Sequence, residues 1–405
     1  MSAHLISTTE ASSLIEAHMP AYKIVTVPLH EASGRILRSP LLADRDLPPF
    51  DRVTMDGVAI DYGAWQAGVR SFRVEGIAAA GHPQRSLADC KGACIQVMTG
   101  AMLPAQCDTI IPFEDVELQD DHAHIKPSST VTPLTFLHSQ GSDRRAGEVI
   151  VAAGQRLQGT HCAIAAAVGS AQIDVSYVPT IALVSTGDEL KRVEDTVEPY
   201  QIRSANDFGM AASLRNEGFN DITCAYLADD LEQSVAQLGP LLESHDVLIL
   251  TGGVSMGKRD FIPAALEELN VMCHFHKIRQ KPGKPMWFGT SASGKPIFAL
   301  PGNTVSSLVC LHRYVLPALL HAMQALSPKP QYAVLSEAYR FTPPLAGFLP
   351  VKIESQSDGR LLAHPVPTNT SGDYAALSSS DGFVELPEGS DIFLMNDVLR
   401  FYSWS

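Results

Sequence analysis

The feature that most constrains the fold of this chain is an alternation of apolar strand candidates with helical patterns over residues 176–327. The strand candidates are residues 180–185, 222–227, 246–250 and 296–300. The helical patterns are residues 207–217, 231–242, 262–269 and 305–323. Residues 247–250 are continuously apolar, as expected of a strand that is buried on both faces. The alternation therefore predicts an α/β domain whose parallel sheet is covered by helices on both faces.

The segments on either side follow other patterns, and a chain of 405 residues is long enough for about two to four domains. Residues 46–140 contain short strand candidates separated by Gly/Pro turns, which predicts a small β-rich domain. Residues 1–45 and 141–175 each contain a helical pattern. Residues 328–405 return to short strands after a linker rich in proline, which predicts a C-terminal β domain. The predicted fold class is multidomain α/β plus β.

Composition excludes several classes of protein. The formal net charge is -14, so a surface that binds duplex nucleic acid is not expected. No apolar stretch is long enough to cross a bilayer, and the first residues lack the pattern of a signal peptide, so a cytoplasmic location is expected. The seven cysteines are scattered and odd in number, which favours free thiols over a disulfide framework or a zinc site.

Three strand candidates of the α/β domain are each followed by a polar, glycine-rich loop. These loops are residues 185–190, 251–257 and 301–307. In open parallel sheets ligands bind beyond the carboxyl ends of the strands, where glycines allow backbone N–H groups to approach phosphate oxygens. A single loop of this kind is as often structural as functional. Three on one edge, with Glu189 and Asp260 among them, predict a phosphate or nucleotide site whose acids could hold Mg²⁺.

A short basic segment follows in the same domain and stands out in an acidic protein. Lys277, Arg279, Lys281 and Lys284 lie within residues 276–285 without an acid among them. In an extended strand the first three would share one side, which predicts a site for a small anion. The alternative is a solvated basic edge strand that protects against aggregation.

The N-terminal half has turn-rich motifs that are weaker when taken one at a time. Asp56 and Thr99 each precede a glycine and would be ordinary turn residues in isolation. Arg144 and Arg145 beside a turn would suit a phosphate or carboxylate, or else form a surface ion pair. The chain contains neither a Ser-His-Asp signature nor an HExxH motif.

Taken together and in order, these segments resemble the MoeA/gephyrin family of molybdopterin molybdenumtransferases over nearly the whole chain. The markers are PPFDRVTMDGVA, MTGAMLP, RRAGE, ALVSTGDEL, LTGGVSMGKRDF, KIRQKPGKP and ALPGNTVSS. The resemblance implies an elongated four-domain protomer that forms a homodimer. Its domains would be a discontinuous linking domain (1–45 and 141–175), a β-rich domain (46–140), an α/β domain that binds molybdopterin and nucleotide (176–327) and a C-terminal β domain (328–405).

The resemblance also implies an activity: insertion of molybdate into adenylated molybdopterin with Mg²⁺-dependent release of AMP. The implied catalytic residues are Asp56, Thr99, Glu189, Asp260, Lys277 and Lys281, with Asp56 and Thr99 reaching the cleft across the dimer. Glu189, Asp229 and Asp260 would lie around the metal. The implied substrate-binding residues are Arg144, Thr186, Gly187, Asp188, Gly252, Gly253, Ser255, Lys284, Pro301, Gly302, Asn303 and Ser306. The implied protein partners are the molybdopterin adenylyltransferase and enzymes that accept the cofactor; neither nucleic acid nor a membrane is expected.

The chain departs from the family pattern at several positions. Val149 and Ser204 each stand where the family has an acid, Thr304 replaces a proline, and Arg52, Val53 and Val58 also differ. The two lost acids leave three hypotheses open: an active insertase, a catalytically weakened paralogue that binds molybdopterin or molybdate, and a scaffold. A nucleotide pyrophosphatase with the same α/β domain is disfavoured by the PPFDRVTMDG half.

Overall fold

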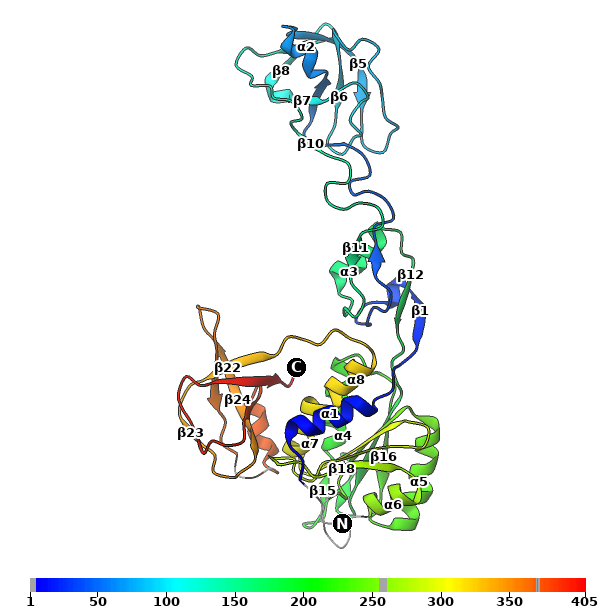
Figure 1. Cartoon of the computed structure of the whole chain (residues 1–405), viewed down its shortest axis with the longest axis vertical. Coiled ribbons are helices and arrows are strands. Elements are labelled where there is room, and N and C mark those ends of the chain that lie inside the picture. Colours follow the sequence, from blue (N-terminus) through cyan, green and yellow to red (C-terminus); the bar gives the residue numbers. More distant parts are fainter. Residues whose placement is uncertain (1–4, 255–260, 369, 371) are drawn as a thin grey trace.

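The computed structural model describes residues 5–254, 261–368, 370 and 372–405. The protein is elongated: a β-rich domain lies at one end, a small linking region lies in the middle, and the α/β and C-terminal β parts lie together at the other end (Figure 1). The multidomain α/β plus β class predicted from the sequence is confirmed.

The α/β part is built on a six-stranded sheet in the order β16-β13-β17-β21-β20-β18. These strands are β13 (Ile181–Thr186), β16 (Ile222–Leu227), β17 (Val247–Thr251), β18 (Met272–His276), β20 (Trp287–Thr290) and β21 (Pro296–Leu300). The first four strands in the order are parallel, as predicted, but β20 and β18 are antiparallel additions at one edge. The two antiparallel strands are added at this edge because the chain returns through a short connection after β18 rather than through a helix.

Helices cover both faces of this sheet, as the alternating pattern predicts. They are α4 (Asn206–Asn216), α5 (Leu231–Ser244), α6 (Ile262–Glu268), α7 (Thr304–Cys310) and α8 (Leu316–Ala322), the last two joined by a π-helical turn (Leu311–Val315). Side chains of β13 alternate between the two faces. Ile181 and Leu183 pack into the core under α4 and α8, while Ala182 and Val184 pack into the core under α5 and α6.

The N-terminal helix α1 (Thr8–His18) packs on the α/β core rather than on the linking region. It begins at Ser7 with a reciprocal capping box that includes Glu10. Its apolar face places Ala11 and Ile15 against the core that contains Leu319 of α8. The linking region itself pairs β1 (Ile24–Pro28) with β12 (Gln172–Ser176) and β2 (Leu41–Leu42) with β11 (Val149–Val151), beside α3 (Gly159–Ala167).

The β-rich domain contains a six-stranded sheet in the order β7-β4-β6-β5-β9-β8. Its strands are β4 (Gly57–Ile60), β5 (Ser71–Ala78), β6 (Ala93–Val97), β7 (Thr109–Pro112), β8 (Val116–Gln119) and β9 (His122–Ile125). Around this sheet lie α2 (Tyr62–Gln66) and the pair β3 (Arg52–Val53) with β10 (Leu137–His138). Separate apolar clusters fill its two faces, so the domain has a core of its own.

The C-terminal sheet runs in the order β19-β24-β25-β22-β28-β26, and a further pairing of β24 with β26 closes it on itself. Its strands are β22 (Gln331–Leu335), β24 (Ala346–Ser355), β25 (Leu361–Pro365), β26 (Gly382–Leu386) and β28 (Val398–Ser403); β23 (Tyr339–Arg340) pairs with β27 (Ile392–Phe393). The strand β19 (Gln280–Lys281) comes from the α/β part and pairs with β24 in parallel. The basic segment therefore joins the two sheets.

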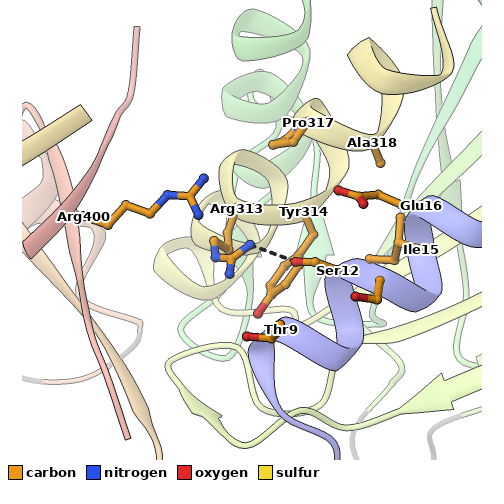
Figure 2. Close-up of a pocket in the computed structure, with 10 residues that line it drawn as sticks. Thr9, Ser12, Ile15, Glu16, Arg313, Tyr314, Pro317, Ala318 and Arg400 are labelled. Carbon is orange, nitrogen blue, oxygen red and sulfur yellow. Dashed lines mark hydrogen bonds between the residues drawn. The ribbon is translucent and has the colours of Figure 1, made fainter. Parts of the chain in front are cut away.

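Side chains also fix the C-terminal sheet to the α/β part. Val305 and Val309 of α7 pack with Phe348 and Phe383. A second place where the two parts meet is shown in Figure 2. It is a cavity of about 240 Å³, lined by residues of α1, the π-helical turn and α8 and by Arg400 of β28. The C-terminal sheet is thus packed against the α/β part through α7.

One helical segment, Thr304–Ala322, is long and apolar enough to cross a membrane by length and composition alone. It is the α7–α8 segment, and 72% of its apolar window is buried inside the protein. A core helix passes the same test, and this segment supplies part of the α/β core.

Candidate functional site

The three glycine-rich loops of the α/β part meet at one edge of the sheet. The N–H of Gly252 donates to the carbonyl of Leu300 at 3.1 Å, which joins the loops after β17 and β21. The Asn206 side chain donates to Thr251 Oγ1 at 2.9 Å and to the Gly302 carbonyl at 2.6 Å, which adds the start of α4 to the same place. The sequence-predicted residues Thr186, Gly187, Gly252, Gly253, Pro301 and Gly302 are therefore brought to one edge.

Close backbone approach explains the glycine at position 252. Its φ is +94°, and a Cβ there would lie 2.5 Å from the carbonyl oxygen of Thr186. Gly302 packs next to it, since a Cβ on Gly302 would lie 3.4 Å from Gly252 Cα. A side chain at position 252 would separate the loops after β13 and β17, so glycine is required there, whereas a Cβ at position 302 would make only an ordinary contact.

Two hydroxyls at the end of β13 lack partners. Ser185 Oγ and Thr186 Oγ1 are buried and form no hydrogen bond with any described residue. An unsatisfied buried polar group costs about 1–3 kcal/mol, so such groups are uncommon without a ligand or water to bond them. They mark the end of β13 as a place where a ligand would make hydrogen bonds.

Asn303 and Ser306 lie where the loop after β21 becomes α7. Asn303 is the N-cap residue of that helix, and its Oδ1 would lie 3.7 Å from a Cβ at Gly372 of the C-terminal part. Ser306 is buried in the first turn. The two predicted residues therefore lie where the sheet edge faces the C-terminal β part.

Carboxylates end two neighbouring strands, β13 and β16. Asp188 Oδ1 accepts a hydrogen bond from the N–H of Asp229 at 3.1 Å. The Glu189 carboxylate folds over Gly187, with Oε2 2.7 Å from the position that a Cβ there would occupy. Oxygen donors from adjacent strand ends suit Mg²⁺, which usually takes one or two carboxylates together with substrate phosphates.

The metal site is not a preformed protein cage in the described part of the chain. Residues 5–254, 261–368, 370 and 372–405 contain no group of three or more His, Cys, Asp or Glu side chains arranged to hold an ion. Glu189 and Asp229 fit a weak site that substrate phosphates would complete. Two predicted residues, Ser255 and Asp260, lie outside the described residues.

A buried carboxylate that sequence reasoning missed lies beside these loops. Asp207, at the start of α4, accepts hydrogen bonds from Ser204 Oγ at 2.7 Å and Tyr226 Oη at 2.5 Å. Burial and the neighbouring Asp207 raise the pKa of the Tyr226 hydroxyl to about 12. Tyr226 and Ser185 line a cavity of about 350 Å³ with Gly187, Asp188, Lys191 and Arg192. Ser204 and Asp207 are only three residues apart in the sequence. Their partner Tyr226 belongs to β16, and no sequence pattern connects it to them.

The basic segment is only partly available to an anion. Ile278 and Gln280 are buried between the cations, consistent with the predicted alternation. Arg279, however, forms an ion pair with Glu388 at 3.3 Å and donates to the carbonyl of Leu5. Arg279 is therefore neutralised by the C-terminal part, and it is not among the predicted site residues of this segment, which are Lys277, Lys281 and Lys284. Lys277, which directly follows β18, has φ +84°, and Lys284 is exposed.

Lys281 lies in a cavity between the two sheets. This cavity has a volume of about 330 Å³, and its lining includes Lys281, Arg340, Thr368 and Thr370. Neither Lys281 nor Arg340 forms an ion pair with any described residue. Two unpaired cations with nearby hydroxyls suit a small oxyanion. Arg340 was missed because no sequence motif links β23 to the basic segment.

Asp56 and Thr99 are brought together, but in the β-rich domain at the other end of the protein (Figure 1). Asp56 Oδ1 accepts from the N–H of Thr99 at 2.6 Å and from its hydroxyl at 2.8 Å. These two hydrogen bonds lower the pKa of Asp56. Arg144 lies near the junction with the linking region, where its N–H donates to the carbonyl of Leu47. Within one chain, none of these three predicted residues reaches the sheet edge.

Comparison with known proteins gives matches over the whole chain. Residues 6–169 match the MoeA N-terminal region (domain I and II), residues 182–321 a probable molybdopterin binding domain, and residues 332–402 the MoeA C-terminal region (domain IV). The chain is 39% identical over 401 residues to the molybdopterin molybdenumtransferase of Synechocystis sp., covering 99% of this chain and 100% of that protein. It is 29% identical over 400 residues to the enzyme of that name from Staphylococcus epidermidis, covering 97% and 94%.

The fold is also shared with a solved structure. The crystal structure of a molybdopterin biosynthesis MoeA protein from Pyrococcus horikosii matches with a TM-score of 0.85 at 28% identity, covering 99% of this chain and 100% of that one. The agreement extends over all the parts described above rather than the α/β part alone.

Proposed function

The chain belongs to the MoeA family of molybdopterin molybdenumtransferases, and from this premise we propose that it inserts molybdate into adenylated molybdopterin and releases AMP. One observation carries the proposal: three glycine-rich loops meet at the carboxyl edge of the sheet beside hydroxyls that have no partner among the described residues, while a cavity lined by two cations that form no ion pair with a described residue lies between the sheets. The first place suits a phosphoanhydride and the second suits an oxyanion.

Cleavage of the adenylate requires stabilisation of charge that develops on phosphate oxygens. Backbone N–H groups of the glycine-rich loops would donate to those oxygens, other than the Gly252 N–H, which already donates to the Leu300 carbonyl. The hydroxyl of Thr186 lies at the same edge and has no hydrogen-bond partner in the part of the chain that the structure describes. No covalent protein nucleophile is needed, because water can supply the oxygen that the AMP phosphorus gains when its bond to the molybdopterin phosphate breaks.

Molybdate would be held by cations at the boundary between the sheets. Lys281 and Arg340 line the same cavity, and Thr370 adds a hydroxyl. Lys277 and Lys284 flank this segment and are proposed to extend the positive potential along the entry. Arg279 is excluded from this role by its ion pair with Glu388.

Glu189 and Asp229 are the described residues that would hold Mg²⁺. When bound, the ion would neutralise negative charge on the substrate phosphates. The carboxylates themselves would orient the phosphate group at the ends of β13 and β16. Asp260 is proposed to contribute to this site, and it lies outside the described residues.

We further propose that the active unit is a homodimer. Asp56 and Thr99 lie in the β-rich domain, far along the protein from the sheet edge (Figure 1). A second copy that placed its β-rich domain over this edge would supply them. The molybdopterin adenylyltransferase would deliver the substrate, cofactor-accepting enzymes would take the product, and a cytoplasmic location is proposed.

The test is AMP release from adenylated molybdopterin by the purified protein, with and without molybdate and Mg²⁺. We expect release that requires both. Lys281→Met is expected to reduce molybdate-dependent release by about two orders of magnitude, since a charged contact to the oxyanion is lost. Lys329→Met in the exposed linker is the matched control and should behave as the unchanged protein. Release that is independent of molybdate would contradict the insertion step.

A second candidate function is that of a binding paralogue without turnover. The residues Val149 and Ser204, which stand where the family has acids, favour it. This candidate predicts tight binding of adenylated molybdopterin with no AMP release under the same conditions.

A further inference from the structure

A hydrogen-bonded chain of three side chains forms one wall of the cavity beside the sheet edge. Ser204 Oγ and Tyr226 Oη both donate to the carboxylate of Asp207, at 2.7 and 2.5 Å. Ser204 and Asp207 are 2% and 3% exposed, whereas Tyr226 is 36% exposed and lines the cavity. The chain therefore runs from the protein interior to the cavity and ends on the tyrosine.

The direction of these bonds decides what Tyr226 can offer a ligand. An ionised carboxylate only accepts hydrogen bonds, so the single phenolic proton of Tyr226 is directed to Asp207. The Tyr226 oxygen then presents lone pairs to the cavity. A tyrosine held in this way is an acceptor, and it selects a ligand that carries an N–H or O–H group at that position.

The rest of the cavity lining supports a ligand that is polar at one end and anionic at the other. Ser185 is 1% exposed, lines the cavity, and has a hydroxyl without a partner among the described residues. Lys191 and Arg192 line the same cavity, and so do the carboxylates Asp188 and Asp195. The Lys191 and Arg192 side chains form no ion pair with a described residue, so they remain available to an anionic group. A volume of about 350 Å³ is in the range of small-ligand pockets.

We propose that this cavity binds the nucleoside half of the adenylate, with the Tyr226 oxygen accepting a hydrogen bond from a ribose hydroxyl or from the exocyclic amine of the base. Asp207 and Ser204 are positioning residues, because they act through Tyr226. The inference rests on the proposed function, which supplies the adenylate. It also gives Ser204 a role: it helps hold a carboxylate three residues further along, at the start of α4.

The test measures the affinity of AMP for the full chain by calorimetry. Tyr226→Phe should weaken binding roughly five- to tenfold, the value of one hydrogen bond. Ser185→Ala should weaken it by a similar factor. Tyr200→Phe is the matched control. Tyr200 is 75% exposed on a neighbouring loop and does not line the cavity, so this variant should bind AMP as tightly as the unchanged protein.

Analogues of AMP identify the donor and separate this role from a structural one. The two deoxyribose analogues and inosine monophosphate each lack one candidate donor group. The unchanged protein should bind one of the three several-fold more weakly than AMP, and Tyr226→Phe should bind that analogue and AMP equally well. Asp207→Ala should also lose the discrimination, while Asp207→Asn, which keeps an acceptor oxygen, should retain part of it.

The outcomes distinguish the two proposals. If Tyr226→Phe binds AMP as tightly as the unchanged protein, the role of Tyr226 is overturned while the insertase proposal stands. The role of Tyr226 is also overturned if the variant binds AMP and all three analogues more weakly by one common factor. A hydrogen bond that only holds α4 against β16 would give that result. If the unchanged protein does not bind AMP, the proposed function fails and this inference fails with it.

Discussion

Ser204 and Asp207 are in direct contact, and this contact governs what a carboxylate at position 204 would do. The Ser204 hydroxyl lies 2.7 Å from Asp207 Oδ1, and both residues are buried. Ser204→Asp would place two carboxylates together in the interior, so the pKa of one of them would rise above its unfolded value. A raised acid pKa makes stability fall as pH rises. We expect a loss of about 2–4 kcal/mol near neutral pH that diminishes below about pH 4.

Thermal unfolding of Ser204→Asp at several pH values checks this expectation. Ser204→Asn is the control, since it is similar in size but neutral. Combining Ser204→Asp with Asp207→Ser should restore stability, because only one carboxylate remains. If Ser204→Asp is as stable as the unchanged protein at about pH 8, the two side chains are not in contact in solution.

Thr99 sets the ionisation of Asp56. Two hydrogen bonds from Thr99 lower the pKa of this carboxylate, so its charge is kept to lower pH than usual. Thr99→Val removes the hydroxyl but leaves the backbone N–H, and the pKa of Asp56 should rise toward its ordinary value. If catalysis uses ionised Asp56, the acidic limb of the pH profile for AMP release should move to higher pH.

The matched control for this change is Thr54→Val. Thr54 is an exposed threonine in the same domain, and its hydroxyl forms no hydrogen bond with a described residue. Its pH profile should coincide with that of the unchanged protein. An unmoved acidic limb in Thr99→Val would show that Asp56 does not act as a carboxylate in the reaction.

At the scale of elements, the sequence was most informative where structure is local. The four parallel strands were predicted to within one residue, because each is a largely apolar run that ends at polar residues, and three of the four end at a glycine-rich loop. The glycine loops could be placed on one edge for the same reason. The antiparallel strands β18 and β20 are not followed by such loops, so they were not predicted. The short strand β19 forms only through its pairing with β24, which lies in a distant segment.

The parts of the candidate site that were missed depend on contacts between distant segments. Arg340 lies beside Lys281 only because β23 of the C-terminal part lies against the α/β part. Tyr226 meets Asp207 because β16 packs beside α4. Arg279 looked available until Glu388 was placed next to it. Single-sequence patterns report periodicity along the chain, and they do not report which segments pack together.

A buried ion pair fastens three elements and predicts a large effect of a single substitution. Arg313 contacts Glu385 of β26 at 3.0 Å and Ser12 of α1 at 2.9 Å, and Figure 2 shows the arginine beside α1. The side chains of Arg313 and Glu385 are only 9% and 13% exposed. Arg313→Met would leave a buried carboxylate without its cation, at a cost of about 3 kcal/mol.

Urea unfolding followed by tryptophan fluorescence measures this loss. The double change Arg313→Met with Glu385→Leu should recover much of the stability, because neither charge is then left buried alone. Lys352→Met breaks an exposed pair with Asp381 and should cost less than about 1 kcal/mol. Equal effects of Arg313→Met and Lys352→Met would contradict the importance of burial.

At the scale of the whole molecule, the elongated shape separates groups that the proposed reaction needs together. Asp56 and Thr99 lie in the β-rich domain at one end, and the sheet edge with Glu189 and Lys281 lies at the other (Figure 1). The linking region between them has its own small core and two short strand pairs. Bending one chain back on itself would break these contacts, so a second copy is the simpler source of Asp56.

This shape makes a prediction about mixed dimers. Asp56→Asn and Lys281→Met should each inactivate the protein, yet a heterodimer of the two should keep one intact site, formed by Lys281 of one chain and Asp56 of the other. Copurification of differently tagged chains would isolate that heterodimer, and its AMP release should be about half that of the unchanged dimer. Placing both changes in one chain, paired with an unchanged chain, damages both sites, so that heterodimer should be inactive. If the activities are reversed, so that the doubly changed chain paired with an unchanged chain is active and the other heterodimer is inactive, each site is built within one chain; if no doubly tagged species forms, the dimer proposal is wrong.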